Sequence, residues 1–181
     1  MTLSHSICGE PVVRLRALEP EDLDLFYAIE NDPSVWDFTQ SAQPYSRFAA
    51  RRYLESMPQD FFQSGELRLV IERADSRAVG FADLVGYAPA DSRAEVCIAL
   101  HHDHRQKGLG TAALAALEEF CRDRLRLRLL YAYVSVHGNE VCNSLFRRLG
   151  YECVAILPQW HARGTGYEDI GVYQKLLRNP A

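Results

Sequence analysis

Apolar and polar residues alternate at the start of the chain in a way that is typical of a half-buried strand. Over residues 11–18, apolar positions alternate with two arginines, which matches the two-residue period of a strand. Apolar residues at helical spacing follow, and Pro20 suits the first position of this helix, which Asn31-Asp32-Pro33 ends. A second helix is predicted over 46–57, with Ser46 as its N-cap residue.

The rest of the chain repeats strand-length apolar runs and two longer stretches with helical periodicity. Asp75-Ser76-Arg77 and Pro89–Ser92 read as turns, so the first three of these runs predict an antiparallel meander. The strand–helix–strand that follows predicts a right-handed parallel crossover. The predicted elements are strands over 67–74, 78–87 and 94–100, a helix over 109–124, a strand over 129–136, a helix within 137–151, and strands over 152–157 and 169–177.

The loop before the 109–124 helix has the composition of a phosphate-binding site. A helix N-terminus carries unpaired N–H groups and partial positive charge, and glycines let the backbone approach a bulky anion. Arg105 and Lys107 add full positive charges. We therefore predict that phosphate binds to the segment Arg105, Gln106, Lys107, Gly108, Leu109, Gly110 and Thr111.

Two other kinds of phosphate loop fit the sequence less well. Gly108-x-Gly110-x-x-Ala113 matches a dinucleotide fingerprint, but the seven residues 101–107 separate it from the preceding strand. The next strand also ends in Val-His-Gly instead of an acidic residue. A Walker motif is absent from the sequence. A nucleotide-binding protein remains a third and weaker interpretation.

Composition and charge narrow the class of protein further. The chain has 181 residues, 48% of them hydrophobic, which suits a single domain over 1–181. A net charge of −4 does not favour nucleic-acid binding. No run approaches 18 apolar residues and the N-terminus lacks an apolar signal region, so no membrane attachment and a cytoplasmic location are expected. Both a monomer and a homodimer remain open.

The cysteines do not form a pattern that predicts disulfides or a metal site. Their number is odd and no two form a Cys-x-x-Cys pair. Reduced, partly buried thiols are therefore expected. The five are Cys8, Cys97, Cys121, Cys142 and Cys153.

Three separated motifs resemble the GNAT superfamily of N-acetyltransferases. Arg105-x-x-Gly108-x-Gly110 resembles its pyrophosphate motif, and Asn139 followed by Gly150-Tyr151 resembles its Asn…Gly-Phe motif. The remaining matches resemble the branch of ribosomal-protein N-terminal and spermidine acetyltransferases: Leu15-Arg16, Glu30-Asn31-Asp32, Trp36, and Trp160…Asp169…Tyr173-Gln174. The order of the predicted elements is also that of the GNAT fold, an α/β fold with a mixed sheet of about seven strands and about four flanking helices.

The resemblance implies acetyl-CoA as acyl donor and no metal. It implies that the parallel strands Ala94–Leu100 and Leu129–Val136 splay apart. The pantetheine arm would then bond to Ile98, Ala99 and Leu100 like an added strand. The pyrophosphate would bind to residues 105–111, and the thioester would lie near Asn139 and Phe146.

The implied reaction is direct attack of a primary amine on the thioester in a ternary complex. The acceptor would be a polyamine, a small amino compound or a protein N-terminus. An alkylamine is protonated at pH 7, so a base is needed, and Glu95 on the strand that lines the splay is the candidate. A cross-strand ion pair on the solvent side is the alternative for Glu95.

The proton donor for the thiolate is less clear from the sequence. Phe146 stands where this branch usually has tyrosine. One alternative is that the thiolate leaves unassisted, because a thiol pKa of about 8.5 makes it a fair leaving group. The other is a substitute donor, for which we assign Tyr133, with Tyr131 beside it, although either ring could be a core aromatic. Cys142 could carry an acyl group, but a packing role is favoured. Phe146 also motivates an alternative function, a CoA-binding sensor or regulatory protein without turnover.

The loop His101-His102-Asp103-His104 contains groups that bind metals. Adjacent side chains in a loop seldom converge on one ion, and the sequence offers no distant ligand cluster. We therefore expect no metal site here.

Overall fold

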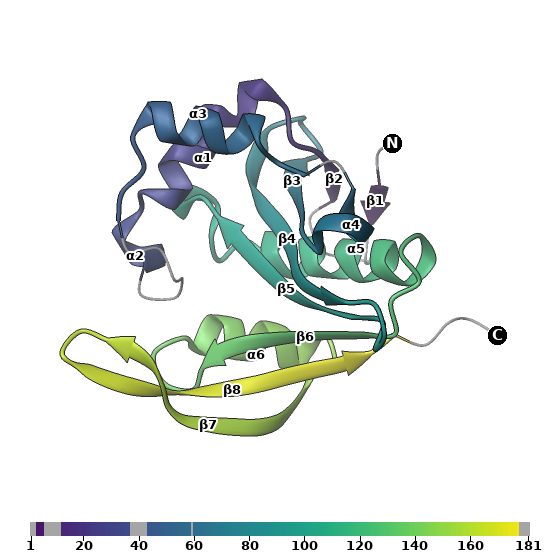
Figure 1. The fold of residues 1–181 in the computed structure, drawn as a ribbon, viewed down its shortest axis with the longest axis vertical. Helices are drawn as coiled ribbons and strands as arrows, with labels where there is room; N and C mark the ends of the chain where they lie inside the picture. Colours follow the sequence, from purple (N-terminus) through teal and green to yellow (C-terminus); the bar gives the residue numbers. More distant parts are fainter. Residues whose placement is uncertain (1–2, 6–11, 37–42, 59, 178–181) are drawn as a thin grey trace.

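The computed structural model describes residues 3–5, 12–36, 43–58 and 60–177. Within them the chain forms a mixed sheet of eight strands in the order β1-β2-β3-β4-β5-β6-β8-β7 (Figure 1). All neighbours are antiparallel except β5 and β6. The strands are β1 (Leu3–His5), β2 (Val13–Ala17), β3 (Leu67–Arg73), β4 (Ala78–Ala88), β5 (Arg93–Leu100), β6 (Leu129–Ser135), β7 (Glu152–Arg163) and β8 (Gly166–Leu176).

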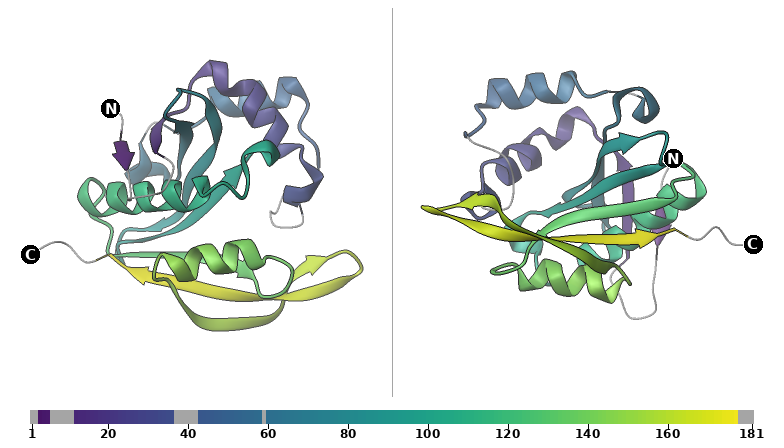
Figure 2. Two further views of the ribbon diagram at one scale, coloured as in Figure 1. Left: turned by 180° about the vertical axis from the view of Figure 1, so that it is seen from behind. Right: turned by 60° about the horizontal axis from the view of Figure 1, so that its bottom comes forward.

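Helices cover both faces of this sheet (Figures 1 and 2). The pair α1 and α3 packs on one face through Phe26, Ile29 and Ala50, which meet Val70 and Phe81 of the sheet. The long helix α5 covers the opposite face, and α6 joins it there against β6 and β8. The helices are α1 (Leu23–Glu30), α2 (Pro33–Trp36), α3 (Arg47–Glu55), α4 (Phe61–Ser64), α5 (Leu109–Asp123) and α6 (Glu140–Arg148).

The predicted fold class is confirmed, and the differences concern short elements. All seven expected strands are present, and β1 adds an eighth by pairing with β2. The short helices α2 and α4 were not predicted, because four residues are too few to show a helical period. Strand β7 continues through Pro158-Gln159-Trp160, where a turn was expected, with a shift of register between Leu157 and His161. Cys8 and the stretch 37–42 lie outside the described residues.

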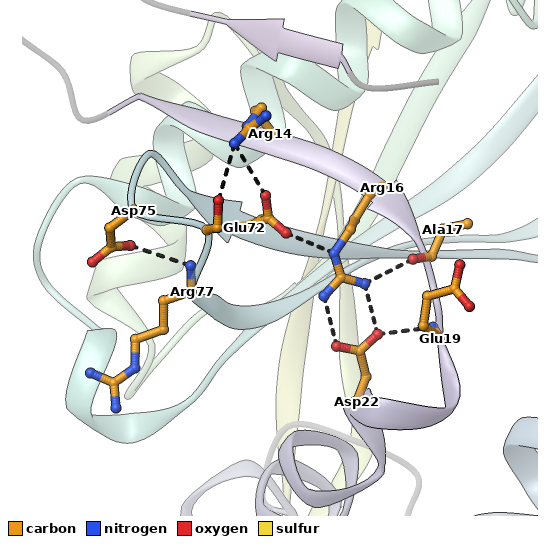
Figure 3. A network of polar contacts seen from close by, with 9 residues as sticks. Arg14, Arg16, Ala17, Glu19, Asp22, Glu72, Asp75 and Arg77 are labelled. Carbon is orange, nitrogen blue, oxygen red and sulfur yellow. Dashed lines mark hydrogen bonds and ion pairs between the residues drawn. The ribbon is translucent and has the colours of Figure 1, made fainter.

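A network of charges fixes the start of α1 against the sheet (Figure 3). Arg16 on β2 donates to both carboxylate oxygens of Asp22, at 2.8 Å each, and to Glu72 of β3 at 2.8 Å. Asp22 is 4% exposed and also accepts the backbone N–H of Glu19. The arginines that alternate with apolar residues on β2 therefore lie on a partly buried face of the strand, where they pair with acidic residues.

The described helices have no membrane-spanning candidate. None of them combines the length and the apolar character that crossing a bilayer requires.

Candidate active site

The parallel strands β5 and β6 pair over only three residues and then separate. The paired residues are Arg93 with Leu129, Ala94 with Leu130, and Glu95 with Tyr131. Beyond this point β5 remains paired with β4 up to Leu100, and β6 remains paired with β8. The expected splay is therefore present, and Val96–Leu100 presents one strand edge that β6 does not cover. At 3.3 Å per residue, this free edge is roughly 16 Å long.

Glu95 lies at the point where the two strands part. Its Oε1 is 3.9 Å from the thiol of Cys97, which donates to it. Burial raises the pKa of Glu95, and the weak bond from Cys97 offsets only part of this effect. In the described part of the chain, no cation is among its partners. The alternative of a cross-strand ion pair is therefore not observed, and Glu95 stands as a lone carboxylate beside the gap.

Two tyrosines of β6 share this region. The rings of Tyr131 and Tyr133 meet edge to face, with centroids 5.7 Å apart. Burial and the nearby Glu95 carboxylate raise the pKa of Tyr131, whose ring also lies under the guanidinium of Arg93. Tyr133 is 46% exposed, so it is not a core aromatic. Tyr133 therefore remains a candidate for the proton donor.

The N-terminus of α5 lies at the open end of the splay. Gly108 is the N-cap residue with φ +76°, and no side chain caps the first turn. The first N–H groups of this 15-residue helix therefore have no intrahelical acceptor. Gln106 also has a positive φ, +58°, which is strained for a non-glycine residue. An uncapped helix preceded by a strained turn is the arrangement expected of an anion site.

Gly110 contributes to this region differently from what the sequence suggested. It is buried, and a Cβ atom there would lie 3.1 Å from Leu145 of α6 and 3.7 Å from Leu100 of β5. Its small size thus allows α5, α6 and β5 to meet. Thr111 and Leu109 are also buried, at 7% and 3% exposure, so only their backbone can meet a phosphate.

The Arg105 side chain is engaged within the protein. Its Nε donates to the carbonyl of Leu100 at 2.9 Å, and its terminal nitrogens donate to Ser34 Oγ and Asp32 Oδ2, each at 2.7 Å. Lys107 is exposed, and its Nζ donates to the Asp103 carbonyl at 2.6 Å. The sequence placed two cations at the phosphate. In the structure Arg105 is paired with a carboxylate, whereas Lys107 contacts one neutral carbonyl and keeps its charge uncompensated by that contact.

The region predicted to hold the thioester contains Asn139 and Phe146. Asn139 caps α6, and its Oδ1 accepts the N–H of Cys142 at 3.3 Å. Phe146 is 6% exposed and packs against Tyr151 and Tyr173, so its ring offers little surface to a ligand. Burial raises the pKa of the Cys142 thiol, which makes this group a poor nucleophile at pH 7.

A buried amide network behind this region was not predicted. Asn143 is 4% exposed, and its Nδ2 donates to the carbonyls of Ser135 and Asn139. Its Oδ1 accepts the hydroxyl of Tyr173 at 2.8 Å. These bonds fix the start of α6 to the end of β6 and to β8. The helical period of Val141, Leu145 and Leu149 gave no sign of them.

The acidic residues near the end of α1 are already paired. Glu30 accepts from Arg68 at 3.0 Å, and Arg68 also binds both oxygens of Asp83, at 2.7 and 2.9 Å. Burial raises the pKa of Asp83 in spite of this contact. Asp32 is bound by Arg105. Glu30, Asp83 and Asp32 are thus each paired with an arginine.

The histidine loop converges more closely than its sequence suggested. Ligand atoms of His101, His102 and Asp103 lie within 4.8 Å of one another. His102 and Asp103 are exposed, and the Asp103 carboxylate lies 3.3 and 3.7 Å from nitrogens of the two imidazoles. His104, by contrast, is buried, and burial together with nearby cations lowers its pKa.

Comparison with known proteins identifies the class to which this arrangement belongs. A family model described as an acetyltransferase (GNAT) domain matches residues 13–152. This match covers the splayed strands, the α5 N-terminus and α6. The chain belongs to the GNAT acetyltransferase family, and it is an acyl-CoA N-acyltransferase by class.

The relatives lie in the spermidine acetyltransferase-like branch. Spermidine N(1)-acetyltransferase of Escherichia coli K12 is 30% identical over 139 residues, which cover 77% of this chain and 72% of the relative. The Vibrio cholerae protein of that name is 23% identical over 157 residues, covering 86% and 88%. The crystal structure of the Vibrio cholerae spermidine N-acetyltransferase in complex with CoA and spermine covers 91% of this chain and 95% of that one, with a TM-score of 0.81 and 21% identity.

Proposed function

We propose that this protein transfers an acetyl group from acetyl-CoA to a primary amine, with a polyamine as the acceptor. The observation that carries the proposal is the end of β5–β6 pairing at Glu95, with the uncapped N-terminus of α5 at the open end. The free edge of Val96–Leu100 suits a ligand arm with two amides. The E. coli relative supports a polyamine as the acceptor.

In this proposal, specific backbone and side-chain groups make the predicted contacts to acetyl-CoA. The backbone of Ile98 bonds to the pantetheine arm. Ala99 and Leu100 contribute through their positions, because the Ala99 carbonyl faces β4 and the Leu100 carbonyl is held by Arg105. The N–H groups of residues 106–111 and the ammonium of Lys107 bind the pyrophosphate. The cap at Asn139 uses its side-chain oxygen, which leaves the amide NH₂ to face the thioester.

The reaction follows from the position of Glu95. A carboxylate with a raised pKa is a better base near neutral pH than an ordinary one. It takes a proton from the bound ammonium group, directly or through water, and the amine nitrogen then attacks the thioester carbon. As the new C–N bond forms, the C–S bond breaks. The departing thiolate takes a proton from the hydroxyl of Tyr133. The second proton that the nitrogen loses on becoming an amide passes to the Tyr133 oxygen, so Glu95 keeps the one net proton that the reaction releases.

Release of free thiol from acetyl-CoA, measured against a panel of amines, tests this function. Spermidine, a small amino alcohol and a peptide with a free N-terminus represent the three acceptor classes. We expect the highest kcat/KM with spermidine. Turnover with only the peptide would overturn the polyamine assignment, and binding of CoA without turnover would favour the sensor that Phe146 suggests.

A charge-reversal pair tests the donor site separately. Lys107→Glu changes the local charge by two units at the proposed pyrophosphate site, and we expect acetyl-CoA to bind about tenfold more weakly. Arg51→Glu makes the same change on the exposed face of α3 and serves as the matched control. Equal affinities in the two variants would remove Lys107 from the donor site.

A further inference from the structure

Arg105 joins two parts of the molecule that are far apart in the sequence. Its guanidinium contacts Leu100 at the end of β5, and it contacts Asp32 and Ser34, which lie 73 and 71 residues away from it. Figure 1 shows that α1 ends, and α2 begins, beside the loop that follows β5. The arginine therefore bridges the proposed phosphate loop and the segment Asn31–Trp36.

The Asp32 end of this bridge is strongly held. Asp32 Oδ1 accepts both the N–H and the hydroxyl of Ser34, at 2.9 and 2.7 Å, while Oδ2 accepts Arg105. Burial alone would raise the pKa of Asp32, but the bonds from Ser34 and Arg105 outweigh it and hold the pKa below its usual range. The carboxylate is therefore ionised throughout the neutral range, and it organises the first turn of α2.

The rest of the segment is fixed from the α1 side. Asn31 donates to the Tyr45 carbonyl at 3.1 Å and accepts the Tyr45 N–H at 2.8 Å. The Trp36 indole donates to the Glu30 carbonyl at 2.7 Å. Contacts to α1 and to the start of α3 thus hold both ends of the segment. Arg105 is the contact that ties it to the phosphate loop.

The same contacts argue against a role for Arg105 as a phosphate ligand. Three of its five N–H donors are satisfied by protein atoms. The Asp32 carboxylate at 2.7 Å compensates its charge. An anion bound to the loop would therefore gain little attraction from the Arg105–Asp32 pair, whose net charge is zero. The exposed Lys107 keeps its positive charge.

We propose that Arg105 is a positioning residue that couples the donor loop to the Asn31–Trp36 segment, and that this segment lies on the acceptor side of the site. This inference rests on the proposed function. The segment lies on the α1 face of the sheet, which is also the face of Glu95, because Ala99 packs on that side and side chains two and four residues apart on a strand share a face. Acetyl-CoA bound at residues 106–111 would stabilise the segment further through Arg105, and the stabilised segment would bind the amine more tightly.

Hydrogen exchange of the full-length protein tests the coupling without knowledge of the acceptor. In the wild type, acetyl-CoA should slow exchange in peptides that cover 105–111 and also in peptides that cover 29–36. In Arg105→Lys, which cannot reach three acceptors, only the 105–111 peptides should respond, and exchange at 29–36 should be about tenfold faster before any addition. Asp32→Asn keeps the cap of α2 but weakens the bridge, so it should behave like Arg105→Lys.

Arg16→Lys is the matched control. Arg16 makes two hydrogen bonds to Asp22 at the opposite end of α1, where Arg105 makes one to Asp32 and one to Ser34. The Arg16 side chain is 27% exposed, against 33% for Arg105. This variant should leave exchange at 29–36 and its response to acetyl-CoA as in the wild type. An equal response in Arg105→Lys and the wild type would overturn the coupling.

Kinetics separate the coupling from the proposed function. With spermidine as acceptor, Arg105→Lys and Asp32→Asn should each raise the acceptor KM about tenfold, and the double variant should add little. The Kd for acetyl-CoA should change less than about twofold. A Kd at least tenfold weaker with an unchanged acceptor KM would make Arg105 a phosphate ligand and overturn the proposal. If the wild type does not bind acetyl-CoA, the proposed function itself fails.

Discussion

Replacing Glu95 by glutamine removes the proposed base with almost no change in shape. The carboxylate lies at the last paired position of β5 and β6, and its one hydrogen-bond partner among the described residues, the Cys97 thiol, is a weak donor at 3.9 Å. General base catalysis typically contributes about 10²–10⁴-fold to a rate. We therefore expect Glu95→Gln to lower kcat/KM for the amine at pH 7 by about that factor, as measured by thiol release at saturating acetyl-CoA and amine concentrations below KM.

The pH dependence gives a sharper result than the rate at one pH. Burial raises the pKa of Glu95, so kcat/KM of the wild type should rise with pH through a value above the ordinary glutamate pKa of about 4.3. The variant lacks this group, and its rate should depend only on deprotonation of the amine, whose pKa is about 10. The variant should therefore partly recover at high pH.

The same substitution has a predictable effect on stability. Because the folded state raises the pKa of Glu95, the native state binds more protons than the unfolded state between about pH 4.3 and the raised value. The free energy of unfolding thus falls as pH rises through this window, and the full penalty remains at pH 7. Glu95→Gln avoids this penalty, so its Tm should exceed that of the wild type at pH 7 and match it at pH 4.

Glu118→Gln is a suitable control for these measurements. Burial also raises the pKa of Glu118, but its carboxylate on α5 accepts from Lys175 at 2.6 Å. This variant should lose stability, because it removes one partner of an ion pair, and keep its activity per folded molecule. A wild-type pH profile in Glu95→Gln would refute the role of Glu95 as base, and a lower Tm at pH 7 would refute the burial argument.

Three further substitutions probe the scaffold of the site. Gly80→Ala would place a Cβ 2.2 Å from the Ala99 carbonyl oxygen. We expect calorimetry to show a loss of about 1–3 kcal/mol in the free energy of unfolding, together with weaker binding of acetyl-CoA. An unchanged Tm would contradict this expectation. Gly108→Ala places a residue with a side chain at φ +76°, which should lower the free energy of unfolding by about 1–2 kcal/mol. An unchanged midpoint of denaturant unfolding would contradict this strain. Arg68→Met leaves Asp83 buried without its cation and should cost about 3–5 kcal/mol. That deficit should shrink as pH falls, because Asp83 becomes protonated, and a deficit independent of pH would contradict this reason.

The elements that depend on repeated burial could be predicted from the sequence. Helices α5 and α6 follow the 3.6-residue period of their apolar residues, because each buries one face against the larger core. Strands β3 to β6 show as apolar runs of strand length, and β3 and β4 bury consecutive residues because helices cover both faces of the sheet. Ser46 accepts the N–H of Ala49 as predicted, and Gly150 adopts a positive φ after α6. Local chemistry determines such caps, so a short window of sequence suffices.

The partners of charged side chains could not be predicted in this way. The roles of Arg105 and Arg68 depend on residues that only the folded sheet brings near, such as Asp32 and Glu30. An exposed loop arginine and a bridging arginine have the same local pattern. Gly110 illustrates the same limit, because its contact with Leu145 depends on how two helices meet.

Calorimetric titration of the full-length protein with acetyl-CoA tests the central claim most directly. The claim is that the free edge of β5 and the uncapped N-terminus of α5 form one binding site for the donor. We predict saturable binding of one acetyl-CoA per chain, which NAD and ATP do not displace. The absence of binding, or displacement by NAD or ATP, would contradict the account.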